Sequence, residues 1–155
     1  MKLSRTTERM TAGRILVVDD QADMCWVLSK LLSKRGHIVG TAQSGACALK
    51  MLDGFDCQVV VVDYRLPDSN GIALSIQMTS RLPRLISILM TSYGGDALCN
   101  QAMDENLFAY FDKPFNNDIM IATIESGLQA WETGGEGGVL TRPQTLFPGR
   151  ATPAQ

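Results

Sequence analysis

Residues 58–63 read QVVVVD, four consecutive valines between a glutamine and an aspartate. An uninterrupted apolar run of this length, rather than an alternating one, is typical of a central parallel strand that is covered on both faces. Turn-forming residues follow closely, in the segment LPDSNG at residues 66–71. The stretch therefore predicts an α/β fold with this strand inside a parallel sheet.

Strand-like and helix-like segments alternate on both sides of this run. Short apolar or β-branched stretches predict four further strands, at residues 14–18, 37–41, 85–90 and 107–111. Helical spacing, capping residues and glycine or proline stops predict five helices, at residues 21–35, 44–54, 72–81, 96–104 and 116–131. This alternation indicates a five-stranded parallel sheet, doubly wound with helices on both faces. Right-handed crossovers leave few topologies, and we expect the flavodoxin-like strand order 2-1-3-4-5.

The two ends of the chain differ in composition from its middle. The 155 residues suit one ordinary domain. We expect a flexible N-terminal segment at residues 1–12, a single domain at residues 13–131, and a flexible tail rich in glycine and proline at residues 132–155.

Composition and charge exclude several classes of protein. With 14 basic and 16 acidic residues the net charge is −2, which gives no electrostatic reason for direct nucleic-acid binding by this chain. Its apolar stretches are strand-sized, far short of the roughly 20 residues of a membrane-spanning helix. The four cysteines form no CxxC pair, so we expect buried thiols in a reduced, cytoplasmic protein.

Polar side chains stand at the ends of four predicted strands. They are Asp19 and Asp20 after the first strand, Asp63 at the third, Thr91 at the fourth and Lys113 at the fifth. The carboxyl ends of parallel strands open on one edge of a sheet, and ligands bind there, where the strand order reverses. We therefore expect these side chains to meet in one site.

The residue types at this edge favour phosphoryl chemistry. Clustered carboxylates raise one another's pKa unless a cation is present, and oxygen ligands of this kind suit Mg²⁺. Lys113 would offset the charge of a phosphoryl group, and Thr91 would donate a hydrogen bond to it. Asp63 could then act as a nucleophile towards phosphorus.

Together with Pro114, these strand-end residues resemble the receiver domain of bacterial two-component response regulators, over about residues 13–131. The resemblance implies a phosphorylation-dependent signalling switch rather than a metabolic enzyme, one that catalyses only its own phosphoryl transfer and dephosphorylation. The phosphodonor would be a sensor histidine kinase or a histidine phosphotransfer protein.

The resemblance also implies a role for each residue of the site. Asp63 would be the phosphoacceptor. Asp20 would bind Mg²⁺ directly and Asp19 largely through water, with Asp63 and the backbone carbonyl of Arg65 as further ligands. Lys113 would pair with the phosphoryl oxygens or, before phosphorylation, with Asp63.

A switch is implied for Thr91, the remaining residue of the site, and for Tyr110. Thr91 would swing towards the phosphoryl group, and Tyr110 would turn inward when the threonine moves. The face formed by residues 96–104, 109–111 and 118–131 would then change and bind a downstream protein or a second copy of the chain. The bond before Pro114 is expected to be cis.

Each residue also has a plain structural interpretation. The pair Asp19-Asp20 could cap a helix, Thr91 could be a turn hydroxyl, Lys113 a surface charge and Tyr110 a core residue. The only histidine, His37, is expected at the surface, which leaves histidine-based catalysis without support.

Two enzymatic or redox alternatives lack residues that they need. A flavodoxin-like electron carrier needs a phosphate loop rich in Ser, Thr and Gly after the first strand, where this chain has DDQAD at residues 19–23. A phosphatase of the haloacid-dehalogenase type needs a second acid at the position of Arg65. What remains open is whether the chain acts alone, which we favour, or is the N-terminal receiver of a longer DNA-binding transcription regulator.

Overall fold

The computed structural model describes residues 12–134 of the chain. Most of the predicted N-terminal segment and of the predicted tail, residues 1–11 and 135–155, lies outside the described residues.

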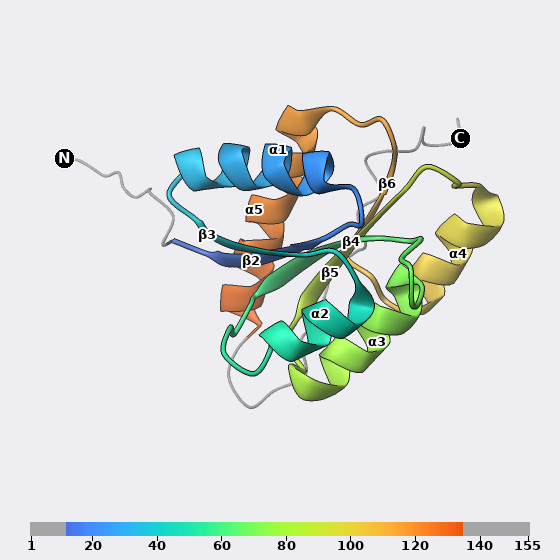
Figure 1. The fold of residues 1–155 in the computed structure, drawn as a ribbon, viewed down its shortest axis with the longest axis horizontal. Coiled ribbons are helices and arrows are strands. Elements are labelled where there is room, and N and C mark those ends of the chain that lie inside the picture. The colour runs from blue at the N-terminus through green and yellow to red at the C-terminus, as the bar shows by residue number, and fades with distance from the viewer. Residues whose placement is uncertain (1–11, 135–155) are drawn as a thin grey trace.

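The described strands form one parallel sheet, shown in Figure 1. They are β2 (Arg14–Val18), β3 (Ile38–Ala42), β4 (Val59–Asp63), β5 (Ile86–Thr91) and β6 (Ala109–Asp112). Their order across the sheet is β3-β2-β4-β5-β6. This confirms the predicted order 2-1-3-4-5 and places the valine-rich strand β4 at the centre.

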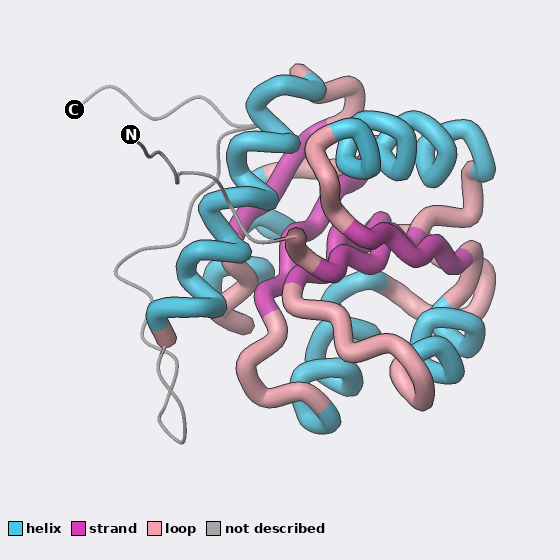
Figure 2. The backbone as a smooth tube through the Cα atoms, turned by 90° about the vertical axis from the view of Figure 1, so that its left-hand side faces the viewer, coloured by secondary structure: helices cyan, strands magenta, loops and turns pink. Residues whose placement is uncertain are grey.

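Helices cover both faces of the sheet (Figures 1 and 2). They are α1 (Ala22–Lys34), α2 (Gly45–Met51), α3 (Gly71–Arg81), α4 (Asp96–Asp104) and α5 (Asn117–Thr133). Side chains of α1 and α5 pack in one hydrophobic core, and side chains of α2, α3 and α4 pack in the other. The central strand supplies both cores, because Val59 and Val61 face the first and Val60 and Val62 the second.

Local side-chain chemistry sets the ends of several helices. Ser44, Asn70 and Asn116 each accept a hydrogen bond from the backbone N–H three residues on, at the start of α2, α3 and α5. Gly36 follows α1 with φ of 93°, a left-handed conformation that glycine adopts without strain.

Two expectations about single residues were wrong. His37 is buried rather than at the surface, because α5 packs over the connection between α1 and β3. Its Nδ1 accepts a hydrogen bond from the Gly13 backbone N–H at 2.9 Å, and its Nε2 lies 2.9 Å from a carboxylate oxygen of Glu125 on α5. Cys47 is exposed, whereas the other three cysteines are buried as expected.

Within residues 12–134, every helix is too short or too polar to span a membrane.

Candidate functional site

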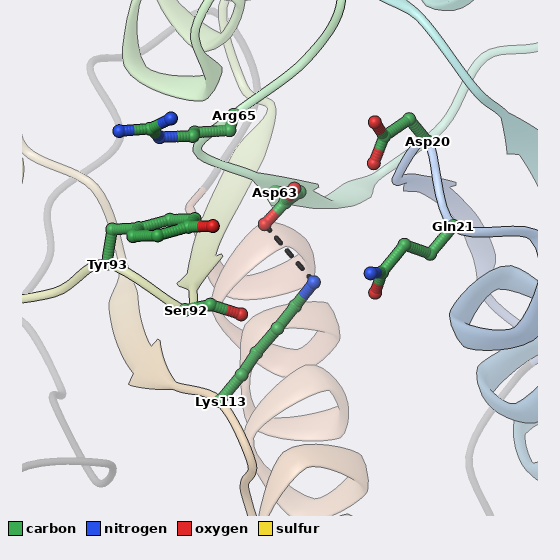
Figure 3. Close-up of a pocket in the computed structure, with 7 residues that line it drawn as sticks. All are labelled: Asp20, Gln21, Asp63, Arg65, Ser92, Tyr93 and Lys113. Atoms are coloured by element: carbon green, nitrogen blue, oxygen red, sulfur yellow. Dashed lines mark ion pairs between the residues drawn. The ribbon is translucent and has the colours of Figure 1, made fainter.

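The strand-end residues meet at the carboxyl edge of the sheet, where a small pocket opens (Figure 3). Its lining consists of Asp20, Gln21, Asp63, Arg65, Ser92, Tyr93 and Lys113. The register of the sheet explains the meeting, since Val18 of β2 pairs with Val62 of β4. The next residues along these two chain segments, Asp19 and Asp63, therefore lie beside each other.

Three carboxylates crowd together in this site. One carboxylate oxygen from each of Asp19, Asp20 and Asp63 lies within 4.8 Å of the others. Asp19 and Asp63 are buried, whereas Asp20 is exposed. Burial of Asp63 and the nearby charge of Asp19 raise the pKa of Asp63 from 3.8 to about 6.

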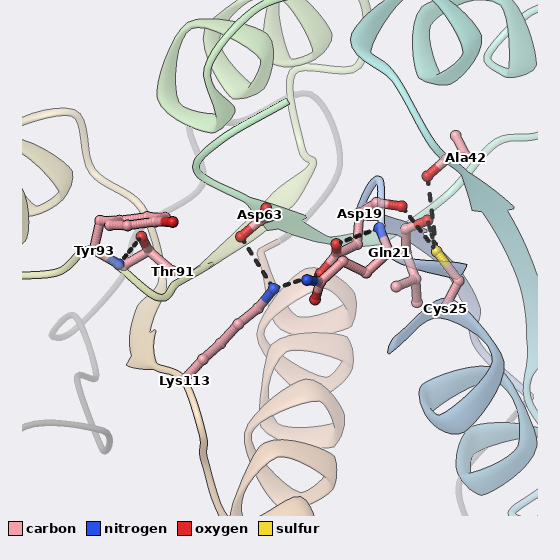
Figure 4. Close-up of polar contacts among 9 residues, drawn as sticks. Asp19, Gln21, Cys25, Ala42, Asp63, Thr91, Tyr93 and Lys113 are labelled. Atoms are coloured by element: carbon pink, nitrogen blue, oxygen red, sulfur yellow. Dashed lines mark hydrogen bonds and ion pairs between the residues drawn. The ribbon is translucent and has the colours of Figure 1, made fainter. Parts of the chain in front are cut away.

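Lys113 supplies the positive charge of the site (Figure 4). Its Nζ donates a hydrogen bond to Asp19 Oδ2 at 2.7 Å and lies 3.2 Å from Asp63 Oδ1. Burial alone would lower the pKa of Lys113, but the two carboxylates raise it overall, so the ammonium group stays charged. The Lys113 backbone N–H bonds to the Thr91 carbonyl, and the Lys113–Pro114 bond is cis, as predicted.

The two carboxylates that follow β2 are held differently. Asp19 is fully buried, and its Oδ1 accepts a hydrogen bond from the backbone N–H of Gln21 at 2.9 Å. Since its Oδ2 is engaged by Lys113, both oxygens of Asp19 already have a donor. Asp20 lines the pocket instead, so it is the carboxylate of this pair that a ligand in the pocket reaches first.

Thr91 and Tyr110 are both fully buried and do not line the pocket. Thr91 ends β5, and its Oγ1 accepts a hydrogen bond from the Tyr93 backbone N–H at 2.9 Å. The Tyr110 hydroxyl donates to Asp112 Oδ1 at 2.9 Å and accepts from the Gly95 backbone N–H at 3.2 Å. The aromatic side chain therefore already points inward.

Comparisons with known proteins identify the family of the chain. The family model for the response regulator receiver domain matches residues 15–125. The chain belongs to this family. It is 32% identical over 123 residues to the DNA-binding transcriptional regulator NtrC of Escherichia coli K12, an alignment that covers 79% of this chain and 26% of NtrC. It is 33% identical over 122 residues to the transcriptional regulatory protein FixJ of Bradyrhizobium diazoefficiens, covering 79% of this chain and 60% of FixJ.

Solved structures show the same fold. A CheY-like receiver domain protein from Methanospirillum hungatei JF-1 superposes with a TM-score of 0.76 at 24% identity, covering 81% of this chain and all of that one. The BeF₃-activated receiver domain of DrrB superposes with a TM-score of 0.70 at 28% identity, covering 77% and 99%. The chain is thus a receiver domain of two-component response regulators and spans only part of the regulators that it matches.

One contact of this receiver domain was missed by sequence reasoning. The Arg65 guanidinium carbon lies 4.1 Å from the centre of the Tyr93 ring, at the pocket wall. The two residues stand two positions beyond Asp63 and Thr91, which end adjacent strands. That equal offset was the signal from which their contact could have been predicted.

The acidic cluster fits a hard divalent cation. Its donors are carboxylate oxygens, the ligand type that Mg²⁺ prefers. The pKa of Asp63 is raised first by burial and then by the charge of Asp19, and Lys113 lowers it only in part. A further positive charge near Asp20 and Asp63 would relieve the remaining repulsion.

Proposed function

We propose that this receiver domain is a phosphorylation-dependent switch in which Asp63 accepts the phosphoryl group. The donor is a phosphohistidine of a sensor histidine kinase or of a histidine phosphotransfer protein. One observation carries the proposal: the Asp63 carboxylate lines an open pocket, 3.2 Å from the ammonium group of Lys113 and beside two further carboxylates.

The transfer makes one bond and breaks one. A carboxylate oxygen of Asp63 bonds to phosphorus while the phosphorus–nitrogen bond of the phosphohistidine breaks, and the bonding electron pair returns to the imidazole nitrogen. With a pKa of about 6, Asp63 is mostly ionised at neutral pH and can act as the nucleophile. Lys113 reaches the developing charge on the phosphoryl oxygens from its position beside Asp63.

Mg²⁺ is the proposed cofactor, held by Asp20, Asp63 and the backbone carbonyl of Arg65, with Asp19 acting through water. Both carboxylate oxygens of Asp19 already accept hydrogen bonds, which supports an indirect role for this residue. Bound there, the ion supplies charge that stabilises the phosphoryl oxygens during transfer.

The output is proposed to arise from Thr91 and Tyr110. Among residues 12–134, the Thr91 hydroxyl oxygen accepts a hydrogen bond from the Tyr93 backbone N–H and donates none, which leaves its proton for a phosphoryl oxygen. Movement of Thr91 then favours the inward position that Tyr110 already takes in this structure and changes the face made by α4, β6 and α5, on which a downstream protein or a second copy docks. A coupling of a few kcal/mol is enough for such a switch.

A second candidate places this domain, at residues 13–131, in the N-terminal part of a longer DNA-binding transcription regulator. Two similarities favour this alternative: NtrC is a DNA-binding transcriptional regulator and FixJ a transcriptional regulatory protein, and the chain covers 26% of the first and 60% of the second. In both cases the chemistry at Asp63 is the same, the catalysis is limited to the domain's own phosphorylation and dephosphorylation, and the proposed location is the cytoplasm.

Intact-mass measurement after incubation with acetyl phosphate and Mg²⁺ tests the proposal. We expect a gain of one phosphoryl group, absent in Asp63→Ala and absent after chelation of Mg²⁺. Asp68→Ala is the matched control, because Asp68 is an exposed carboxylate of the same β4–α3 connection and should leave the gain unchanged. An equal gain in Asp63→Ala would refute the proposal.

A further inference from the structure

The Tyr110 hydroxyl lies between the end of its own strand and the β5–α4 loop, residues 92–95. Asp112 is two residues further along β6, so both side chains project from the same face of the strand. The hydroxyl donates to Asp112 Oδ1 at 2.9 Å, and the backbone N–H of Gly95 donates to the hydroxyl oxygen at 3.2 Å. The buried phenol is thus hydrogen-bonded as donor and as acceptor.

A missing side chain makes room for this arrangement. A Cβ atom at Gly94 would overlap both the Tyr110 hydroxyl oxygen and Asp112 Oδ1, far inside van der Waals contact. A Cβ atom at the neighbouring Gly95 would meet nothing within 4 Å, and Gly95 has an extended backbone with φ of 165°. The loop therefore tolerates a side chain at one glycine and excludes it at the other.

The Tyr110 hydroxyl donates to a carboxylate and accepts from a backbone N–H, and both bonds stabilise the buried position of the phenol. A bond from a hydroxyl to a carboxylate is charge-assisted and stronger than one between neutral groups. The Gly95 N–H polarises the phenol and strengthens its donation to Asp112. The raised pKa of Tyr110, about 12 from burial and the bond to Asp112, agrees with a phenol held as the neutral donor.

We propose that Asp112 and Gly94 are positioning residues that hold Tyr110 buried before any phosphoryl group is present. In this tyrosine latch, Asp112 supplies the acceptor and Gly94 the space. Because of the latch, more of the unphosphorylated molecules have Tyr110 inward at the α4-β6-α5 face. Phosphorylation at Asp63 therefore acts on a domain in which this part of the conformational change is already largely made. Its meaning for signalling rests on the proposed function, whereas the latch itself does not.

The exposure of Tyr110 can be measured directly in the full chain. Protein labelled with ¹³C at the tyrosine Cε atoms gives signals from three tyrosines, and the signal missing in Tyr110→Phe identifies the one of interest. A soluble paramagnetic agent then broadens a ring signal in proportion to its exposure. The variants are Asp112→Ala, Asp112→Asn and Gly94→Ala, with Gly95→Ala as the matched control.

Without a phosphodonor, we expect the Tyr110 signal to be protected in the wild type, in Gly95→Ala and, because an acceptor oxygen is kept, in Asp112→Asn. In Asp112→Ala and Gly94→Ala we expect the exposed population to rise about tenfold, as the loss of one charge-assisted hydrogen bond allows. Protection equal to the wild type in the folded forms of both variants would overturn the latch. A purely structural role would lower the melting temperature without exposing Tyr110.

A second arm adds beryllofluoride and Mg²⁺ to the same samples. If Asp63 is the phosphorylation site, beryllofluoride restores the protection of Tyr110 in Asp112→Ala. If beryllofluoride changes no signal in any sample, including the wild type, the proposed function fails, while the comparison without phosphodonor still decides whether the latch exists.

Discussion

Replacing Asp63 by asparagine should stabilise the metal-free domain at neutral pH, although it removes the group at the centre of the site. Burial, followed by the charge of Asp19, raises the pKa of Asp63 from 3.8 to about 6, even with Lys113 alongside. One pKa unit corresponds to about 1.4 kcal/mol, so ionised Asp63 costs the folded state about 3 kcal/mol. Asparagine has nearly the same shape and carries no charge, so it removes this cost.

The gain in the free energy of unfolding from Asp63→Asn should increase with pH, because the pKa of Asp63 is higher in the folded state than in the unfolded state. Well below pH 3.8, Asp63 is protonated in both the folded and the unfolded state, and the cost is absent. As the pH rises, the unfolded state loses its proton first, so the cost grows and is complete above the folded-state pKa of about 6. The advantage of Asp63→Asn over the wild type should therefore be about 3 kcal/mol near pH 7.5 and close to zero near pH 3.5.

Urea unfolding followed by circular dichroism, with EDTA present, measures these differences. Asp20→Asn is the control, because Asp20 belongs to the same cluster but is exposed, and it should give a smaller gain. Added Mg²⁺ should stabilise the wild type more than Asp63→Asn, since a ligand that binds only the folded state stabilises it. An Asp63→Asn domain that is no more stable near neutral pH, or a gain that is unchanged in acid, would refute the electrostatic reasoning.

Three further predictions concern the surroundings of the site. Lys113→Met leaves two buried carboxylates without their cation and should lower the free energy of unfolding by about 3 kcal/mol in EDTA, part of which Mg²⁺ should restore in the same urea experiment. Burial would raise the pKa of Glu125, but hydrogen bonds from Arg35 and His37, which follow α1, lower it overall. Glu125→Gln should therefore lower the free energy of unfolding by about 1 kcal/mol near pH 7 and leave it unchanged once the pH falls below the lowered pKa of Glu125. A difference in thermal melting that persists in acid would contradict this. Asp68 accepts hydrogen bonds from the first two backbone N–H groups of α2, so Asp68→Ala should speed hydrogen exchange of those amides and leave α5 unaffected.

Most of the fold could be predicted from the sequence, because its local signals agree with one another. The valine run of β4 indicated a strand covered on both faces, and the structure divides its valines between two cores. Ser44, Asn70 and Asn116 lie at helix starts, where their side chains cap the backbone. The clustering of the carboxylates with Lys113 followed from parallel strands whose carboxyl ends share one edge.

What the sequence did not indicate depends on contacts between distant segments. His37 is buried because its imidazole pairs with the carboxylate of Glu125, which lies 88 residues further along the chain. The contact of Arg65 with Tyr93 had one sequence signal, the equal offset of the two residues from the ends of adjacent strands, but it also needs the spacing of two loops at the pocket rim. The position of Tyr110 depends on the absence of a side chain at Gly94, which no periodicity reveals.

The central claim is that Asp63 is the carboxylate that carries the phosphoryl group, and chemical trapping tests it most directly. Borohydride reduces an aspartyl phosphate to homoserine with release of phosphate, which marks the modified residue permanently. Peptide mapping of the domain, phosphorylated in the presence of Mg²⁺ and then reduced, should find homoserine at position 63. Homoserine at position 19 or 20, or a phosphorylated domain in which Asp63 remains aspartate after reduction, would contradict the account.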